Sequence, residues 1–273
     1  MKALTTKLKL FNGVEIPLIG LGTYKMTDEH EVYQAIITAL QNGYRHIDTA
    51  QIYGNEELIG KAIKDSGVPR KEIFLTSKIW NANHKYDAAL QEIDNILKRL
   101  DTDYLDLCLV HWPTADRNEC FRALETAYGA KKIRAIGVSN FEVSHLQELM
   151  AISEIKPMVN QVELHPGLNN TDVVKFCQEN NIIIESWATL MQGQCMTNST
   201  VLKIAEKHQK NPAQICLKWA IQQNIVVIPK STHKERIIAN TELDDFMLDD
   251  EDMTALFALP QVRLGADPNN FNF

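Results

Sequence analysis

The sequence predicts an α/β fold of the (β/α)8 barrel class, with an N-terminal β-hairpin and two extra helices. Eight short apolar segments alternate with eight helical patterns, as expected for a barrel of about 250 residues. The segments are apolar along their whole length, as parallel strands are when helices cover both faces of the sheet. The alternative, an open doubly wound sheet, usually has a turn with three glycines after its first strand. The segment Gly20-Leu21-Gly22-Thr23-Tyr24 has only two, so the barrel is favoured.

The predicted elements follow one another in a regular order. A hairpin comes first, because Leu8–Phe11 and Val14–Ile16 flank Asn12-Gly13, a dipeptide typical of a two-residue turn. We expect strands in the short aliphatic runs Leu18–Gly22, Arg45–Asp48, Phe74–Lys78, Leu105–His111, Arg134–Ser139, Val159–Glu163, Ile182–Ser186 and Val226–Pro229. We expect helices at Asp28–Gln41, Glu56–Asp65, Asp87–Leu100, Asn118–Tyr128, Val143–Met150, Thr171–Glu179, Pro212–Gln222 and Lys234–Asn240. The two extra helices are expected at Val201–Gln209 and Asp249–Ala258.

Composition limits the kinds of partner and the compartment. The chain has 273 residues, 45% of them apolar, without repeat or linker, which predicts one domain over residues 1–273. The net charge of −7 argues against nucleic acid or an anionic membrane as partner. The N-terminal residues have no apolar targeting core, and no run is long enough to span a bilayer. The five cysteines show no paired spacing, so we expect reduced thiols in a cytoplasmic protein.

Three of the predicted strands end in ionisable residues. Asp48 closes one strand, Lys78 the next and His111 the third, and Tyr53 follows Asp48 by five residues. Barrel enzymes carry their active sites at the carboxyl ends of the strands, so these side chains are expected to meet. Each alone has a more ordinary interpretation, as a helix cap, a solvated amine or a structural histidine. Four complementary groups on three consecutive strands favour a proton-transfer site.

The chemistry of the four groups suggests a role for each. A free tyrosine has a pKa of about 10, and a nearby ammonium lowers it by favouring the phenolate. Lys78 is expected to supply that charge and Asp48 to hold Lys78 through a salt bridge. Tyr53 is then a usable general acid. His111 is expected to donate a hydrogen bond to a carbonyl oxygen and orient it.

Six ordered motifs show that the chain resembles the aldo-keto reductases over nearly its whole length. They are Gly43-Tyr44-Arg45-His46-Ile47-Asp48-Thr49-Ala50 with Tyr53, Asn55 and Glu56; Thr76-Ser77-Lys78-Ile79-Trp80-Asn81; Val110-His111-Trp112-Pro113; Ile136-Gly137-Val138-Ser139-Asn140-Phe141; Asn160-Gln161-Val162-Glu163-Leu164-His165-Pro166; and Ile228-Pro229-Lys230-Ser231 with Arg236 and Asn240. Short loops and the ending Gly265-Ala266-Asp267-Pro268-Asn269-Asn270-Phe271 are most similar to the compact microbial and protist members.

The resemblance implies hydride transfer from NADPH to a carbonyl carbon, without a metal ion. The family's catalytic tetrad falls on Asp48, Tyr53, Lys78 and His111, with Tyr53 protonating the developing alkoxide. Trp80 and Trp112, which follow strand ends, would line the substrate site beside His111. The remaining histidines show no metal-ligand spacing with the cysteines. His46 is expected to be a hydrogen-bonded core residue, and His165-Pro166 a structural motif.

The resemblance also assigns residues to the cofactor. Ser139, Asn140 and Gln161 would hold the nicotinamide carboxamide, and Trp187 would stack on the nicotinamide ring. Further contacts are expected from Gly22, Thr23, Tyr24, Leu190 and Gln192, with the loop 190–194 closing over the pyrophosphate. Lys230, Ser231, Thr232 and Arg236 would bind the adenosine 2′-phosphate, which favours NADPH over NADH, and Asn240 would reach the adenine.

Two departures from the family pattern concern the same cofactor. Ala188-Thr189 stands where Ser-Pro is usual, and Ala239 where glutamate is usual. Ala188 lacks a hydroxyl that commonly serves the pyrophosphate, and Thr189 or backbone N–H groups would have to compensate. The loss of the glutamate removes one expected contact to the adenine.

The sequence is compatible with several substrate classes and with one function of another kind. The substrate class can be methylglyoxal and other small aldehydes, diketo-sugar acids or a prostaglandin-type lipid, and short loops favour small aldehydes. A cofactor-sensing regulatory protein, like the potassium-channel β subunits that share the fold, is a rival from another class. The intact tetrad argues against pure sensing. Family analogy suggests a monomer.

Overall fold

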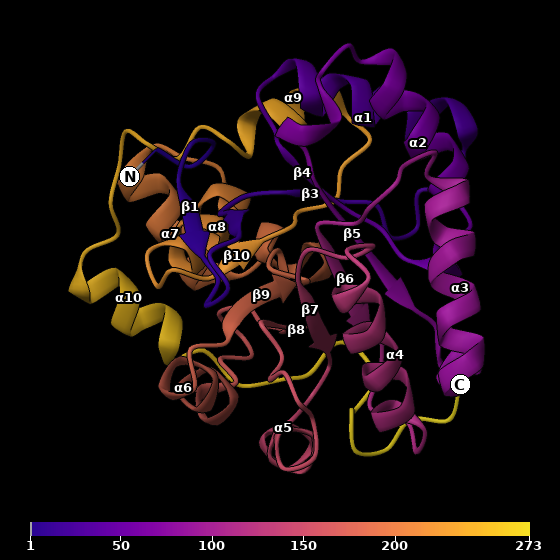
Figure 1. The fold of residues 1–273 in the computed structure, drawn as a ribbon. Coiled ribbons are helices and arrows are strands. Elements are labelled where there is room, and N and C mark those ends of the chain that lie inside the picture. Colours follow the sequence, from indigo (N-terminus) through magenta and orange to yellow (C-terminus); the bar gives the residue numbers. More distant parts are fainter. Residues whose placement is uncertain (1) are drawn as a thin grey trace.

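The computed structural model describes residues 2–273 and forms a barrel of parallel strands inside a ring of helices (Figure 1). The strands are β1 (Lys7–Lys9), β2 (Glu15–Pro17), β3 (Leu21–Gly22), β4 (His46–Asp48), β5 (Phe74–Ile79), β6 (Leu107–Val110), β7 (Ile136–Ser139), β8 (Val159–Glu163), β9 (Ile183–Trp187) and β10 (Val226–Val227). The helices are α1 (Glu29–Gln41), α2 (Glu56–Asp65), α3 (Tyr86–Arg99), α4 (Arg117–Gly129), α5 (Val143–Met150), α6 (Thr171–Glu179), α7 (Ser199–His208), α8 (Pro212–Ile221), α9 (Lys234–Ala239) and α10 (Asp250–Phe257). Short 3-10 turns lie at η1 (Gln51–Tyr53), η2 (Arg70–Glu72), η3 (Asn81–Asn83) and η4 (Met191–Met196).

The eight strands β3 to β10 pair in parallel in sequence order, and the two edge strands meet to close the barrel. Isolated parallel bridges join Ile19 to Val227 and Gly22 to Lys230 across this seam. The seam is tight at Gly22, because a Cβ there would lie 2.5 Å from the carbonyl oxygen of Ile228. The predicted (β/α)8 barrel is confirmed, and the carboxyl ends of all eight strands therefore face one mouth.

The N-terminal hairpin covers the other end of the barrel. β1 and β2 pair antiparallel in the register Leu8↔Ile16. The Asn12 side-chain amide donates to the carbonyl oxygen of Arg134, just before β7, at 2.9 Å. The predicted two-residue turn is wrong, because Leu10 N–H donates to Val14 O and leaves three residues in the loop. Gly13 supplies the positive φ of +89° that this longer turn requires.

The predicted strands and helices all appear, with shifted ends. The closing strands are shorter than predicted: β3 begins at Leu21, and β10 covers only Val226–Val227. Residues beside each of these strands pair with the other strand at isolated bridges, Ile19 with Val227 and Lys230 with Gly22. Side-chain caps mark the starts of some helices. Asp28 accepts from Glu31 N at the start of α1, and Asn211 with Gln214 forms a capping box before Pro212 in α8.

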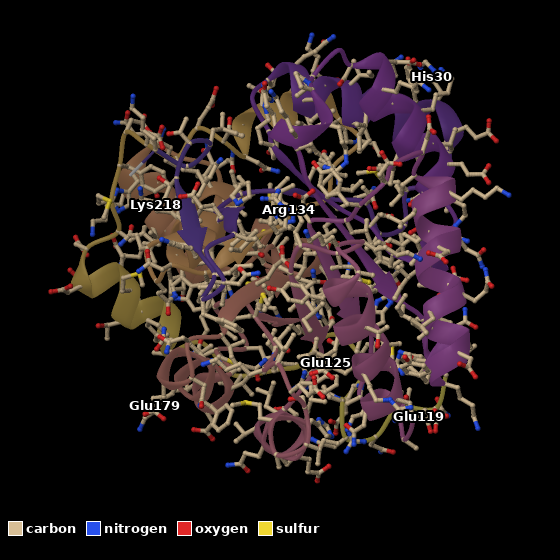
Figure 2. The ribbon with its side chains drawn as sticks, in the orientation of Figure 1. His30, Glu119, Glu125, Arg134, Glu179 and Lys218 are labelled. Carbon is tan, nitrogen blue, oxygen red and sulfur yellow. The ribbon has the colours of Figure 1, made fainter. Side chains whose placement is uncertain are left out.

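The core fills the interior and the space between strands and helices, while charged side chains cover the outside. His30 on α1 and Glu179 on α6 lie on this outer surface (Figure 2). No helix within residues 2–273 combines the length and apolar character needed to cross a membrane. The five cysteines are buried with free thiols.

Candidate active site

A fully buried ion pair lies at the carboxyl ends of β4 and β5. Lys78 Nζ donates to Asp48 Oδ1 at 2.6 Å and to the carbonyl oxygen of Thr49 at 2.8 Å. Lys78 has no exposed surface and Asp48 is 2% exposed. Burial lowers the pKa of Lys78, but the charge of Asp48 and the hydrogen bond to it oppose burial, and the pKa of Lys78 is raised. The pair therefore places a fixed ammonium beneath the barrel mouth, as the sequence predicted.

Tyr53 lies over this ammonium on the turn η1. Lys78 Nζ is 5.2 Å from the centroid of the Tyr53 ring, and the half-buried ring lies edge-on to His111 at 5.8 Å between centroids. Burial raises the pKa of Tyr53 to about 12, and the charge of Lys78 opposes that rise. The expected lowering by Lys78 is thus present but smaller than the desolvation. Tyr53 is protonated at neutral pH, the state that a proton donor needs.

His111 completes the group of four from the end of β6. Burial, together with the charge of Lys78, holds the pKa of His111 well below 6.5, so the imidazole is neutral. A neutral imidazole carries one N–H and can donate to an oxygen. Asn140 Nδ2 donates to the His111 carbonyl oxygen at 3.0 Å, which ties the end of β6 to the end of β7.

Aromatic side chains wall the mouth above these groups, and the C-terminal tail supplies two of them. Trp80 meets His111 edge-on at 5.1 Å and stacks on Phe273 at 5.7 Å between ring centroids. Trp112 contacts both Phe271 and Phe273 at 5.1 Å. Figure 1 shows the tail in yellow running from α10 past β8 to a C-terminus near α3. The C-terminal tail therefore folds over the mouth.

The groups expected to face a nicotinamide gather at the ends of β7, β8 and β9. Ser139 Oγ donates to the Gln161 carbonyl oxygen at 3.0 Å, and Asn140 Oδ1 accepts from Trp187 Nε1 at 2.9 Å. The C-terminal segment packs against the Trp187 ring, because a Cβ on Gly265 would lie 2.4 Å from its Cη2. These four side chains are brought together as predicted.

The loop after β9, which is expected to close over the cofactor, begins with Ala188-Thr189 in place of the usual Ser-Pro. The Thr189 hydroxyl pairs with Ser186 Oγ at 2.6 Å and donates to the Ser186 carbonyl oxygen. Thr189 is therefore engaged within the protein. Leu190 and Gln192 lie on this loop, where Gln192 Nε2 donates to the carbonyl oxygen of Leu264.

The seam between β3 and β10 carries the residues expected to bind the adenosine end. The Lys230 backbone bridges to Gly22, the Thr23 hydroxyl donates to the Asp48 carbonyl oxygen, and Tyr24 lies exposed with its ring 5.1 Å from that of Tyr53. Ser231, Thr232, Arg236 and Asn240 follow on the turn before α9 and on α9 itself.

Two exposed cations lie at this seam. In a protein of net charge −7, Lys230 and Arg236 are exposed, and neither pairs with a carboxylate anywhere in residues 2–273. Two free cations beside a polar turn fit a phosphate dianion.

The sequence interpretation passed over one buried acid and two aromatic groups. Glu185 directly follows the run Ile182-Ile183-Ile184 in β9, and its side chain lies inside the barrel with no exposed surface. Its position within an apolar strand was the signal that could have identified it. Phe271 and Phe273 were visible only as aromatic residues in a turn-rich tail.

Two histidines have the structural roles predicted for them. His46 Nε2 lies 3.2 Å from Thr76 Oγ1, and His165 Nε2 lies 3.1 Å from Glu163 Oε1. Across residues 2–273, no three His, Cys, Asp or Glu side chains are arranged to hold a metal ion.

Residues 18–259 match the model of the Aldo/keto reductase family. The chain belongs to the aldo-keto reductase family. This aldo-keto reductase is 48% identical to glyoxal reductase of Bacillus subtilis, over 99% of both chains. It is 44% identical to the 9,11-endoperoxide prostaglandin H2 reductase of Trypanosoma cruzi, over 96% of this chain and 94% of that one. The family that the motifs predicted is confirmed, and the chain is an oxidoreductase of that family.

Solved structures agree with the fold. An aldo-keto reductase from a Medee basin deep-sea metagenome superposes with a TM-score of 0.95 at 45% identity, covering 97% of this chain and 100% of that one. A mutant of Gox0644, solved in complex with NADPH, superposes with a TM-score of 0.93 at 37% identity, covering 98% and 99%.

Proposed function

We propose that this aldo-keto reductase is an NADPH-dependent carbonyl reductase that acts on small aldehydes. The observation that carries the proposal is the stack of Asp48, Lys78, Tyr53 and His111 at one mouth of the barrel. The buried ammonium lies 5.2 Å from the Tyr53 ring, and a neutral imidazole lies beside the phenol. A protonated phenol, a fixed positive charge and a neutral donor are the groups needed to protonate an alkoxide.

Each of the four residues has a separate role in carbonyl reduction. His111 donates a hydrogen bond to the substrate carbonyl oxygen and orients it. Tyr53 gives its phenolic proton to the same oxygen as negative charge develops there. The Lys78 ammonium stabilises the phenolate that results, and Asp48 holds Lys78 in place through the 2.6 Å ion pair. When bound, NADPH supplies the hydride that reduces the carbonyl carbon.

The residues present fit NADPH. Lys230 and Arg236 are the free cations expected for the 2′-phosphate, and Asn240 lies buried on the same segment, where it can reach an adenine. Asn140 accepts from the Trp187 indole, and Asn140, Ser139 and Gln161 would hold the carboxamide end. The NADPH complex of the Gox0644 mutant supports the choice of cofactor.

The aromatic groups at the barrel mouth and the name of one relative both favour small aldehydes as substrates. Trp80, Trp112 and Phe273 form an aromatic cluster beside His111, and glyoxal reductase of Bacillus subtilis is named for a small dialdehyde. A second candidate substrate class is a prostaglandin-type endoperoxide, because the Trypanosoma cruzi relative is named for one. Access for so large a molecule would need the tail to move away from Trp80.

The test is an NADPH oxidation assay over a panel of glyoxal, methylglyoxal, a diketo-sugar acid and a prostaglandin endoperoxide. We expect kcat/KM to be highest for the two small aldehydes and NADPH to be preferred to NADH. Tight NADPH binding with no turnover of any carbonyl would instead support a sensing role and would rule out the proposal.

A further inference from the structure

A chain of buried polar groups runs from the ion pair into the barrel interior. Gln161 on β8 places its amide nitrogen between two carboxyl groups: 2.9 Å from Asp48 Oδ2 on β4 and 2.8 Å from Glu185 Oε2 on β9. The three side chains are 0–3% exposed. Beyond Glu185, His46 Nε2 lies 3.6 Å from Glu185 Oε1.

This arrangement fixes the orientation of the Gln161 amide. An amide NH2 group has two N–H donors, and two acceptors 2.8–2.9 Å away use both. The opposite orientation would place the amide oxygen 2.9 Å from Asp48 Oδ2, whose carboxylate is paired with Lys78 and has no proton to donate. The amide oxygen is therefore directed away from both acids, and no side chain or backbone N–H in residues 2–273 donates to it.

Glu185 has no cation of its own. Lys78 is paired with Asp48 at 2.6 Å, and burial lowers the pKa of His46 to about 3, so that imidazole is neutral. Burial and then the charge of Asp48 raise the pKa of Glu185 to about 8, against the opposing effects of Gln161 and Lys78.

Other neighbours of Glu185 do not change that balance. The groups that titrate beside it are Asp48 and His46 from β4 and Lys78 from β5. Its register partners, Gln161 on β8 and Val226 on β10, carry no charge. Glu185 Oε1 has no hydrogen-bond partner.

We propose that Glu185 is a positioning residue, which holds the Gln161 side chain so that its amide oxygen accepts a hydrogen bond from the nicotinamide carboxamide. This inference rests on the proposed function, because it needs a nicotinamide at the mouth. Glu185 itself touches neither cofactor nor substrate. Asp48 alone uses one N–H of Gln161, and the second acceptor, Glu185 on the neighbouring strand β9, prevents the amide from rotating.

The binding test compares Glu185→Leu, Glu185→Gln and a control variant. Glu56→Gln is the matched control, since Glu56 is also a buried carboxyl (2% exposed) but bonds Ser77 and Arg99 outside the barrel. Two probes are titrated by calorimetry: NADPH, and adenosine 2′,5′-bisphosphate, which lacks the nicotinamide. Circular dichroism checks that each variant is folded.

We expect Glu185→Leu to weaken NADPH binding about tenfold, the value of one good hydrogen bond, and to leave binding of the bisphosphate unchanged. Glu185→Gln keeps an acceptor for Gln161 and should bind NADPH within about threefold of the wild type. Equal losses for both probes, or no loss for NADPH, would overturn the role of Glu185. A wild type that binds no NADPH would overturn the proposed function, and this inference with it.

A second measurement needs no cofactor and remains available if Glu185→Leu fails to fold. A carboxyl whose pKa is higher in the folded than in the unfolded state binds more protons when folded. The contribution of this carboxyl to the free energy of unfolding is then most favourable below about pH 4, and it falls as the pH rises toward 8. The unfolding equilibrium constant of the wild type should rise by up to about tenfold per pH unit through this window. Glu185→Gln should have a shallower pH dependence than the wild type, because it keeps only the part that comes from the raised pKa of Asp48; identical pH profiles for variant and wild type would show that Glu185 does not hold its proton.

Discussion

Removal of the Lys78 ammonium should be costly in two measurable ways. In Lys78→Met, the apolar stem keeps most of its volume, but the 2.6 Å contact to Asp48 and the 2.8 Å contact to Thr49 are lost. Breaking a buried pair by removing one partner typically costs about 3–5 kcal/mol of folding free energy. Asp48 keeps one bond, from Gln161 Nε2 at 2.9 Å, which places the expected cost toward the lower end of that range.

The stability loss should depend on pH in a defined direction. Burial already raises the pKa of Asp48, and Lys78 opposes that rise. Without Lys78 the pKa of Asp48 rises further above its unfolded value. The folded state then binds more protons, so the variant should be least destabilised below about pH 4 and progressively more so as the pH increases. Urea unfolding at several pH values measures this, with Lys64→Met as the control, since the Lys64–Asp101 pair is exposed and its loss should change little.

The catalytic effect should appear in kcat. The Tyr53 phenolate loses the charge that stabilises it, so kcat should fall by about 10²–10⁴, the usual contribution of a general acid. More substrate should not restore the rate, because the defect is in the chemical step. Asp48→Asn should be milder, since Lys78 keeps its charge and loses only its anchor. A folded Lys78→Met with nearly normal kcat, or a folded Asp48→Asn that is worse, would refute the proposed order of roles.

Three other substitutions test separate parts of the site. Tyr53→Phe should reduce aldehyde turnover by about 10²–10⁴ while calorimetry shows NADPH affinity nearly unchanged; normal turnover would exclude Tyr53 as the acid. Arg236→Ala should lower the ratio of NADPH to NADH kcat/KM by about tenfold or more, whereas Lys234→Ala on the same helix should not; equal effects on both cofactors would remove Arg236 from the 2′-phosphate site. Phe273→Ala removes the ring stacked on Trp80, so kcat/KM should rise for bulky aldehydes and stay nearly constant for glyoxal; no change for either would mean that the tail does not limit access.

Most of the fold could be predicted because its signals are local. Apolar strands separated by helical patterns determine the order of elements, and caps such as Asp28 and Asn211 mark the helix starts. The ends of β3 and β10 were misplaced because these strands meet each other across the whole length of the sequence. The pairing of these two strands ends where the barrel closes, and local sequence patterns carry no information about that closure.

The candidate site was predicted where the residue type and the strand end coincide, as at Asp48, Lys78 and His111. The direction of the Tyr53 pKa shift was not, because desolvation depends on packing that a motif does not describe. Glu185 was missed for a similar reason: its importance comes from a 2.8 Å contact with Gln161 on the neighbouring strand. The single domain, the monomeric state and the cytoplasmic location stay predictions.

The central claim is that hydride passes from NADPH to a carbonyl carbon at the Tyr53–His111 mouth. The most direct test uses NADPH that carries deuterium at the transferable position of the nicotinamide, with methylglyoxal as substrate and mass spectrometry of the product. We expect one deuterium on the alcohol carbon for each NADPH oxidised by the wild type, and almost no labelled product with Tyr53→Phe. Oxidation of NADPH without deuterium in the alcohol, or labelled product formed equally well by Tyr53→Phe, would contradict the claim.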